Sequence, residues 1–85
     1  MKILLTGVSI LNGEPIRYYM IEETTKKDAD SYGVMVEFKG EQTKVRKLSS
    51  SEKEIQVLLE QMRKGIVTPV SVPDVAEDWL VGNRI

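Results

Sequence analysis

The chain opens with two largely apolar segments that are separated by a two-residue turn signal, a pattern typical of a β-hairpin. The segments Ile3 to Leu11 and Glu14 to Glu23 flank the dipeptide Asn12-Gly13. Both residues of this dipeptide tolerate positive φ, so it suits the type I′ turn of a two-residue hairpin. The pattern therefore predicts a β-hairpin at the start of the chain.

Two further strands are predicted after a polar loop at Thr24 to Ser31. Residues after this loop alternate with a period of two, which places four apolar side chains on one buried face: Tyr32, Val34, Val36 and Phe38. A turn at Lys39 to Gln42 leads to a fourth strand, in which Thr43 and Val45 continue that inner face. Strands that follow one another through short turns predict an antiparallel meander.

The apolar spacing changes to three and four residues after Leu48, which indicates a helix. Ser49 to Glu54 contains two overlapping capping boxes, one of which is expected to start this helix. Gly65, just after Arg63-Lys64, is expected to end it. The buried stripe of this helix comprises Ile55, Leu58, Leu59 and Met62.

A second helix is predicted after an extended connector, Ile66 to Val70. Ser71 is expected to cap it, Pro73 suits its first turn, and Gly82-Asn83 is expected to end it. Its apolar face comprises Val72, Val75, Ala76, Trp79 and Leu80. The predicted fold is α+β: a four-stranded antiparallel β-meander with two C-terminal helices (ββββαα) packed on one face, all within a single domain of residues 1–85.

The first hairpin carries more apolar surface than these helices can cover. With a regular two-residue loop, Leu4 lies opposite Ile21, and Tyr19 points to the same side. Met35 of the third strand joins this second face. Two short helices cover only one side of a four-stranded sheet. We therefore expect Leu4, Tyr19, Ile21 and Met35 to lack cover from their own chain and to be covered by a second copy or by another protein.

Composition removes most enzyme chemistry. The 85 residues include neither His nor Cys, so imidazole acid–base catalysis, thiolate nucleophiles, zinc sites and disulfides are excluded. Ser49 to Ser51 supplies hydroxyl groups, but no base is evident beside them, and helix capping explains them. We expect no catalytic residue, no metal site and no cofactor, and we interpret the protein as a non-enzyme.

Charge and hydropathy indicate the surroundings of the protein. Twelve basic and 13 acidic residues give a formal charge of −1, so no global field favours nucleic acid. Cations on the outer sheet face, among them Arg17, Lys44 and Arg46 beside Tyr19, could form a single-strand platform, but Glu37 dilutes their field. The apolar run after Met1-Lys2 is interrupted and too short for a membrane span, so we expect a cytoplasmic protein without membrane contact.

Two features of the second helix have a structural and a functional interpretation. Asp74, Glu77 and Asp78 share one side of the helix and could hold a hard cation, but acids near a helix start stabilise it through the dipole. Trp79, the single tryptophan, is interpreted as a core anchor rather than a contact residue. We favour the structural interpretation of both features, although the sequence does not decide between them.

Three motifs occur in order along the chain: Tyr32-Gly33-Val34, the capped helix, and the connector Val67-Thr68-Pro69-Val70 before the acidic helix Asp74 to Leu80. In these motifs the chain resembles a family of small clostridial (Firmicutes) proteins of unknown function. The resemblance covers residues 16–81. It implies an origin in Firmicutes or in one of their phages, and it implies no activity and no site residue.

Two functions of different classes follow from these observations. The first is a non-enzymatic interaction or regulatory module that binds another protein and forms a homodimer through its sheet. The second is a phage-type antagonist of host defence, acting as an inhibitor or as a sponge for a small ligand such as a nucleotide, with Arg17, Tyr19, Lys44 or Arg46 contacting the ligand. The identity of the partner or ligand and the oligomeric state are not specified by the sequence.

Overall fold

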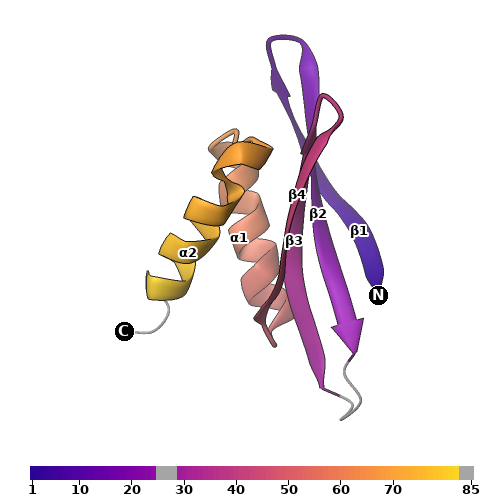
Figure 1. Ribbon diagram of the computed structural model, residues 1–85, viewed down its shortest axis with the longest axis vertical. Helices are drawn as coiled ribbons and strands as arrows, with labels where there is room; N and C mark the ends of the chain where they lie inside the picture. The colour runs from indigo at the N-terminus through magenta and orange to yellow at the C-terminus, as the bar shows by residue number, and fades with distance from the viewer. Residues whose placement is uncertain (25–28, 83–85) are drawn as a thin grey trace.

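A computed structural model of the chain describes residues 1–24 and 29–82. Within these residues the chain forms one antiparallel sheet followed by helices, so the predicted α+β fold is confirmed (Figure 1). The strands lie in chain order across the sheet, β1-β2-β3-β4. The elements are β1 (Lys2–Leu11), β2 (Glu14–Thr24), β3 (Asp30–Phe38), β4 (Glu41–Ser49), α1 (Glu52–Lys64), the 3-10 helix η1 (Pro69–Ser71) and α2 (Val72–Gly82).

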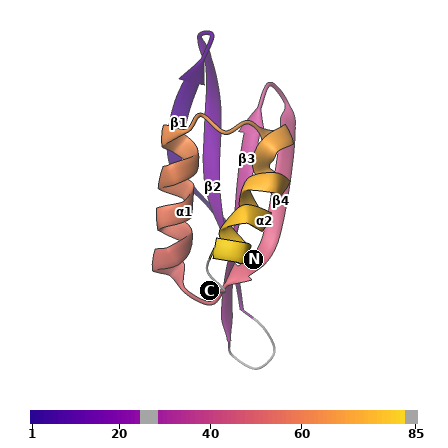
Figure 2. The same cartoon turned by 90° about the vertical axis from the view of Figure 1, so that its left-hand side faces the viewer.

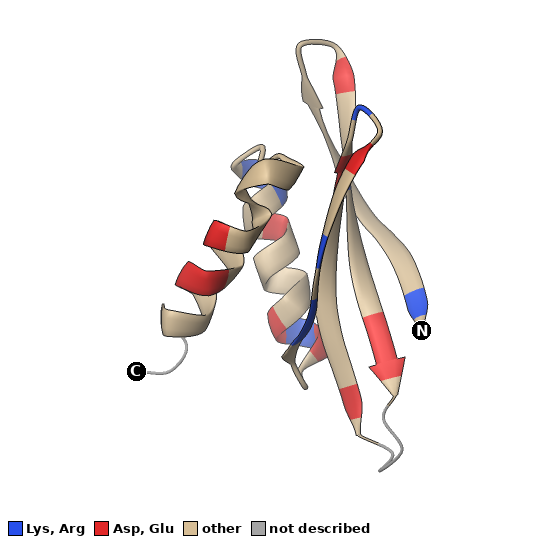
Figure 3. Cartoon of the chain, viewed as in Figure 1, with Lys and Arg blue, Asp and Glu red and all other residues tan. Residues whose placement is uncertain are grey.

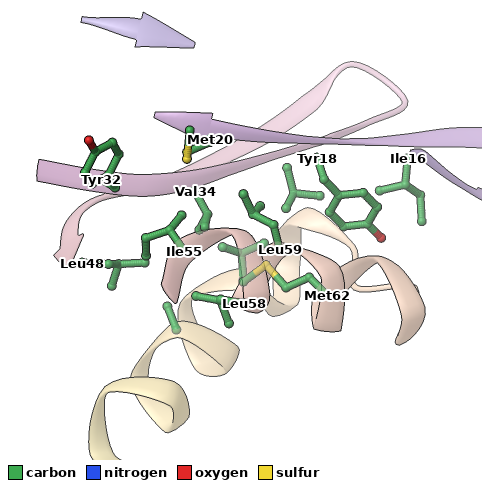
Figure 4. Packing of buried hydrophobic residues seen from close by; sticks show 13 residues of the cluster. Ile16, Tyr18, Met20, Tyr32, Val34, Leu48, Ile55, Leu58, Leu59 and Met62 are labelled. Carbon is green, nitrogen blue, oxygen red and sulfur yellow. The ribbon is translucent and has the colours of Figure 1, made fainter. Parts of the chain in front are cut away.

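Both α-helices lie on the same face of the sheet, with α1 near β1 and β2 and α2 near β4 (Figure 2). The core fills the space between these two layers, and Figure 4 shows how its side chains meet there. The α1 stripe is buried as predicted, and so are Val72 and Ala76 of α2, with Val75, Trp79 and Leu80 packed against the core. The sheet contributes Ile16, Tyr18, Met20, Tyr32, Val34, Val36 and Leu48.

Two-residue turns join the strands at both described hairpins. Asn12 and Gly13 have φ of 52° and 80°, the left-handed values that a type I′ turn requires. Lys39 and Gly40 have nearly the same values, 51° and 81°. The predicted turn at Lys39 to Gln42 was therefore too long, because β4 begins at Glu41. Of the predicted loop at Thr24 to Ser31, residues 25–28 lie outside the described residues, and the strands occupy both of its ends.

A chain of polar contacts starts α1. Ser51 is the N-cap, and its side chain accepts a hydrogen bond from the backbone N–H of Glu54 (3.2 Å). The backbone N–H of Ser51 donates to the Ser49 hydroxyl (3.0 Å), which in turn donates to the Glu54 carboxylate (2.8 Å). Of the two predicted capping boxes, Ser49 with Glu52 and Ser51 with Glu54, the second starts the helix. The Ser49 hydroxyl bridges the Ser51 backbone N–H and the Glu54 carboxylate, which in a standard capping box bond directly. Gly65 ends the helix as predicted.

The segment between the helices differs from the extended connector that the sequence predicted. Its second half forms η1, which runs directly into α2 at Val72, so Ser71 belongs to a helical turn and does not cap a free helix start. The first half is held to the sheet by the buried Tyr18, whose hydroxyl donates to the carbonyl of Val67 (2.9 Å). Burial raises the pKa of this phenol above its ordinary value. The predicted end of α2 is confirmed at Gly82, and Asn83 lies outside the described residues.

Gly33 marks a close approach of β3 and β4. A Cβ at this position would lie 2.3 Å from the carbonyl oxygen of Val45 and 2.9 Å from the Cα of Arg46. Both are backbone atoms in the register shift between the two strands, so they cannot swing aside. Glycine is therefore required here by the spacing of the strands.

We expect Gly33→Ala to lower the free energy of unfolding by about 2 kcal/mol or more, in the upper range of overpacking substitutions. The measurement is urea unfolding followed by circular dichroism. Gly82→Ala is the matched control, because nothing lies within 4 Å of a Cβ there. Equal stability of the two variants would contradict the close approach of β3 and β4.

Ser51→Ala removes the N-cap of α1 and is expected to lower the free energy of unfolding by about 1 kcal/mol, the usual loss for a serine cap. Ser50→Ala on the same turn is the control, because Ser50 is exposed. Thermal unfolding of both variants makes the comparison, and a larger loss at position 50 would mean that the cap is misassigned.

Candidate functional site

A β-bulge in β1 decides which side chains this strand presents. The register runs regularly from Leu11↔Glu14 to Gly7↔Tyr18 and then skips a residue, so that Leu5 pairs with Tyr19. Thr6 is the extra residue, and its hydroxyl donates to the carbonyl of Tyr18 (3.1 Å). A regular register was expected, and it is correct only as far as Gly7.

Beyond the bulge every side chain lies on the face opposite to the expected one. Leu4 pairs with Met20, on the helix side of the sheet, and Ile3 takes the place opposite Ile21. The prediction that Leu4 shares a face with Tyr19 and Ile21 is therefore wrong. A single inserted residue reverses the alternation because side chains in a strand have a period of two.

The outer face of β1, away from the helices, is apolar and exposed. Its side chains are 40% to 60% exposed, and β1 forms one edge of the sheet. We call this surface the β1 patch, consisting of Ile3, Leu5, Val8 and Ile10. None of these four residues was predicted as a site residue. On the helix side, Leu4 is also 43% exposed.

Two predicted contact residues are instead covered by their own chain. Ile21 is fully buried and Met35 is only 6% exposed, although both lie on the outer face. The N-terminal half of β1 turns away from the helices (Figure 1) and passes behind β2 when viewed from the helix side (Figure 2). This course carries β1 over the outer face and accounts for the burial of both side chains. Tyr19 is half-buried.

The predicted cations reach the outer face but are largely paired with acids. Lys44 lies in one row with Met35, Tyr19 and Leu5 across the four strands. In the neighbouring row, Arg17 Nη1 lies 3.6 Å from Glu37 Oε1.

The guanidinium of Arg46 binds both carboxylate oxygens of Glu23, with Nε 2.7 Å from Oε1. Hydrogen bonding from Arg46 holds the pKa of Glu23 below its ordinary value. Arg17 and Arg46, the two arginines expected to hold an anionic ligand, each have a carboxylate partner already.

A hollow of about 370 Å³ opens between the bulge of β1 and α1. The α1 side is tied to the strand by the Ser9 hydroxyl, which donates to the carbonyl of Arg63 (2.6 Å). The aliphatic part of the Arg63 side chain packs on Gly7, where a Cβ would approach Arg63 Cδ to 2.8 Å, and its guanidinium pairs with Glu60. The hollow is lined by Thr6, Gly7, Gln56, Leu59, Glu60 and Arg63.

A second, wider groove of about 550 Å³ lies between the helices, where Trp79 of α2 faces Val57 and Gln61 of α1. Trp79 was interpreted as a core anchor rather than a contact residue. It packs on the core and also lines a surface groove. The acidic residues of α2 are exposed, and Figure 3 marks acidic positions along this helix in red. Within residues 1–24 and 29–82, no group of three or more Asp or Glu is placed to hold a metal ion.

The two edges of the sheet differ in how they are protected. Both edge strands contain a register shift, and β4 in addition carries four charged residues, a common device against unwanted strand pairing: Glu41, Lys44, Arg46 and Lys47. β1 is ten residues long and carries one charge, Lys2. The chain therefore guards one edge with charge and leaves the other apolar.

Fold and surface together define a small α+β protein with an open, apolar edge strand. The chain matches the model of a family of unknown function, DUF6514, over residues 3–82 and belongs to that family. No curated protein and no solved structure matches the chain. None of the helices in the described part of the chain has the length and hydrophobicity to cross a membrane.

Ile21 and Leu5 lie in adjacent rows of the outer face, but only Ile21 is buried within its own chain. Substituting each residue therefore tests whether β1 covers Ile21 while Leu5 stays exposed. Ile21→Ala should lower the free energy of unfolding by about 2–4 kcal/mol, because the fully buried side chain leaves a cavity. Leu5→Ala should lower it by less than about 1 kcal/mol in dilute protein, as for other exposed positions. Urea unfolding measures both, and equal losses would contradict the cover that β1 gives to Ile21.

Proposed function

We propose that this protein is a non-enzymatic interaction module that binds another protein chain through β1. One observation supports this most directly: β1 combines a sheet edge with an exposed apolar face, whereas the opposite edge, β4, is charged. Exposed apolar patches on small soluble domains mark contact surfaces. A regulatory role through such contact is part of the proposal.

The chemistry of β1 suits strand addition. An edge strand offers backbone N–H and C=O groups that an extended partner segment can pair with, and alternate side chains supply the specificity. On the outer side, Ile3, Leu5, Val8 and Ile10 would meet apolar side chains of the partner. On the helix side, the hollow between Thr6, Gly7 and α1 opens beside the strand.

The alternative, a phage-type antagonist that traps a nucleotide or a similar anion, has less support. It needs free cations near Tyr19, but Arg17 lies beside Glu37 and Arg46 is bound to Glu23. An anion would have to displace both carboxylates. Lys44 is exposed in the row of Tyr19 and is the residue on which this alternative would depend.

The absence of enzymatic activity and the cytoplasmic location are also proposals. They rest on the composition, which includes no His and no Cys, and on the lack of a long apolar segment in the sequence. A clostridial or phage origin rests on the motif resemblance alone. Protein binding is consistent with all of these proposals.

Affinity capture with three versions of the chain tests the proposed function. The wild type, the β1 variant Leu5→Lys/Ile10→Lys and the control Val57→Lys are used as baits in extracts of the source cells. Val57 is exposed to about the same extent as Leu5, 50% against 55%. Because Val57 lies on α1, the control adds a charge on the helix side of the molecule, away from the outer face of β1. We expect a protein captured by the wild type and the control and lost by more than tenfold with the β1 variant.

Circular dichroism confirms in parallel that each bait is folded. Capture of the same proteins by all three baits, or capture lost only with Val57→Lys, would overturn β1 as the binding surface. Stabilisation of the chain by a nucleotide in a thermal-shift assay, abolished by Lys44→Ala, would favour the ligand-trapping alternative instead.

A further inference from the structure

We infer that β1 pairs with β1 of a second copy of the chain, in antiparallel orientation and with the two-fold axis at the Thr6–Gly7 peptide bond. This inference rests on the proposed function, because it names the partner of the same strand. The two sheets would then form one continuous eight-stranded sheet, four strands from each copy. Three observations on β1 support this pairing.

The first observation is the symmetry that the bulge creates. Ile3 and Leu5 precede the bulge and Val8 and Ile10 follow it, and all four point to the outer face. The second and fourth residues on each side of the Thr6–Gly7 bond point outward: Leu5 and Ile3 before it, Val8 and Ile10 after it. When a second β1 is laid antiparallel about this bond, Leu5 meets Val8 of the other copy and Ile3 meets Ile10.

A strand without the bulge would not have this property, because its two halves would keep one unbroken alternation. The helix-side residues obey the same symmetry, since Leu4 meets Ser9 and Lys2 meets Leu11. At the axis, Thr6 and Gly7 of one copy lie opposite Gly7 and Thr6 of the other. Both strands therefore shift register at the same place, and residues that pair on either side of the axis point to the same face. The pairing is therefore isologous, as a two-fold dimer requires.

The second observation concerns charge. Lys2 is the single charged residue of β1, and in this register it lies opposite Leu11 of the other copy. Lys2 is paired with Glu22 on its own chain, and in the dimer it also comes near Glu14 of the other copy, which is paired with Leu11. The two Lys2 residues lie at opposite ends of the interface and do not repel each other.

The third observation is a projection that matches a hollow. Leu4 points to the helix side and is 43% exposed on its own chain. In the inferred register it lies beside Ser9 and Gly7 of the other copy, where the hollow of about 370 Å³ opens between β1 and α1. Leu59 and the aliphatic part of Arg63 supply apolar lining for it. Each copy would thus fill the hollow of the other.

The absence of cysteine from the natural sequence permits a direct test of register. Leu5→Cys and Val8→Cys chains, one of them carrying a size tag, are mixed and oxidised slowly, as are Ile3→Cys and Ile10→Cys chains. These pairs lie directly opposite in the inferred dimer, about 5 Å apart at Cβ, so we expect a disulfide heterodimer from each mixture. The offset mixtures, Leu5→Cys with Ile10→Cys and Ile3→Cys with Val8→Cys, place the thiols about 7–8 Å apart and should link at least tenfold less.

Light scattering of the untagged wild type supplies the second readout. We expect a dimer for the wild type and for Val57→Lys, and a monomer for Leu5→Lys/Ile10→Lys. Lys2→Glu should raise the dissociation constant several-fold, and Lys2→Glu/Glu14→Lys should restore it, because the exchange re-forms the ion pair. Failure of this rescue would overturn the register.

A wild type that stays monomeric at millimolar concentration would overturn the second copy as the partner. So would a dimer that survives Leu5→Lys/Ile10→Lys, or preferential linkage of the offset cysteine pairs. The capture experiment distinguishes these failures from failure of the proposed function. A monomer whose β1 variant still loses a different captured protein would reject the dimer and retain β1 as a binding surface.

Discussion

Two short helices placed on one side of a four-stranded sheet constrain everything else in this molecule. A sheet needs apolar cover on any face that carries apolar side chains, and 13- and 11-residue helices supply it on one face only. The chain answers in two ways on the other face. Part of that face is charged and paired across strands, with Arg46 of β4 held by Glu23 of β2 and Arg17 of β2 beside Glu37 of β3. The rest of the face, around Ile21 of β2 and Met35 of β3, is apolar, and there β1 bends over its own sheet far enough to bury both side chains.

The extra residue at Thr6 links this local solution to the proposed function. It allows the N-terminal half of β1 to turn towards the outer face, and it also moves Ile3 and Leu5 to that face in place of Leu4. Cover for Ile21 is thus obtained by exposing other apolar side chains at the edge. The exposed apolar surface therefore lies on the edge strand, where backbone N–H and C=O groups are also free to pair with a partner.

Much of the fold could be predicted from the sequence because its signals are local. Asn12-Gly13 identifies the first turn, the serines before Glu54 identify the start of α1, and the change in apolar spacing separates strands from helices. The candidate site could not be predicted as well, because its residues depend on a register shift. A clue was present in Thr6-Gly7, since glycine inside a strand often accompanies a bulge. The burial of Ile21 and Met35 depends on how β1 curves in space, and alternation along one strand carries no information about that curvature.

The order of the strands in the sheet has a consequence for how the chain reaches this structure. Because every strand pairs with its neighbour in sequence, the sheet can assemble by closing short loops in succession, at low entropic expense. Long-range closure comes from packing of the helices on the sheet, together with hydrogen bonds such as that from Ser9 to Arg63 across 54 positions and that from Tyr18 to Val67 across 49. The meander should therefore form early, and the docking of the helices should come last. Until the helices dock, the apolar inner face of the sheet is exposed to solvent, like its outer face.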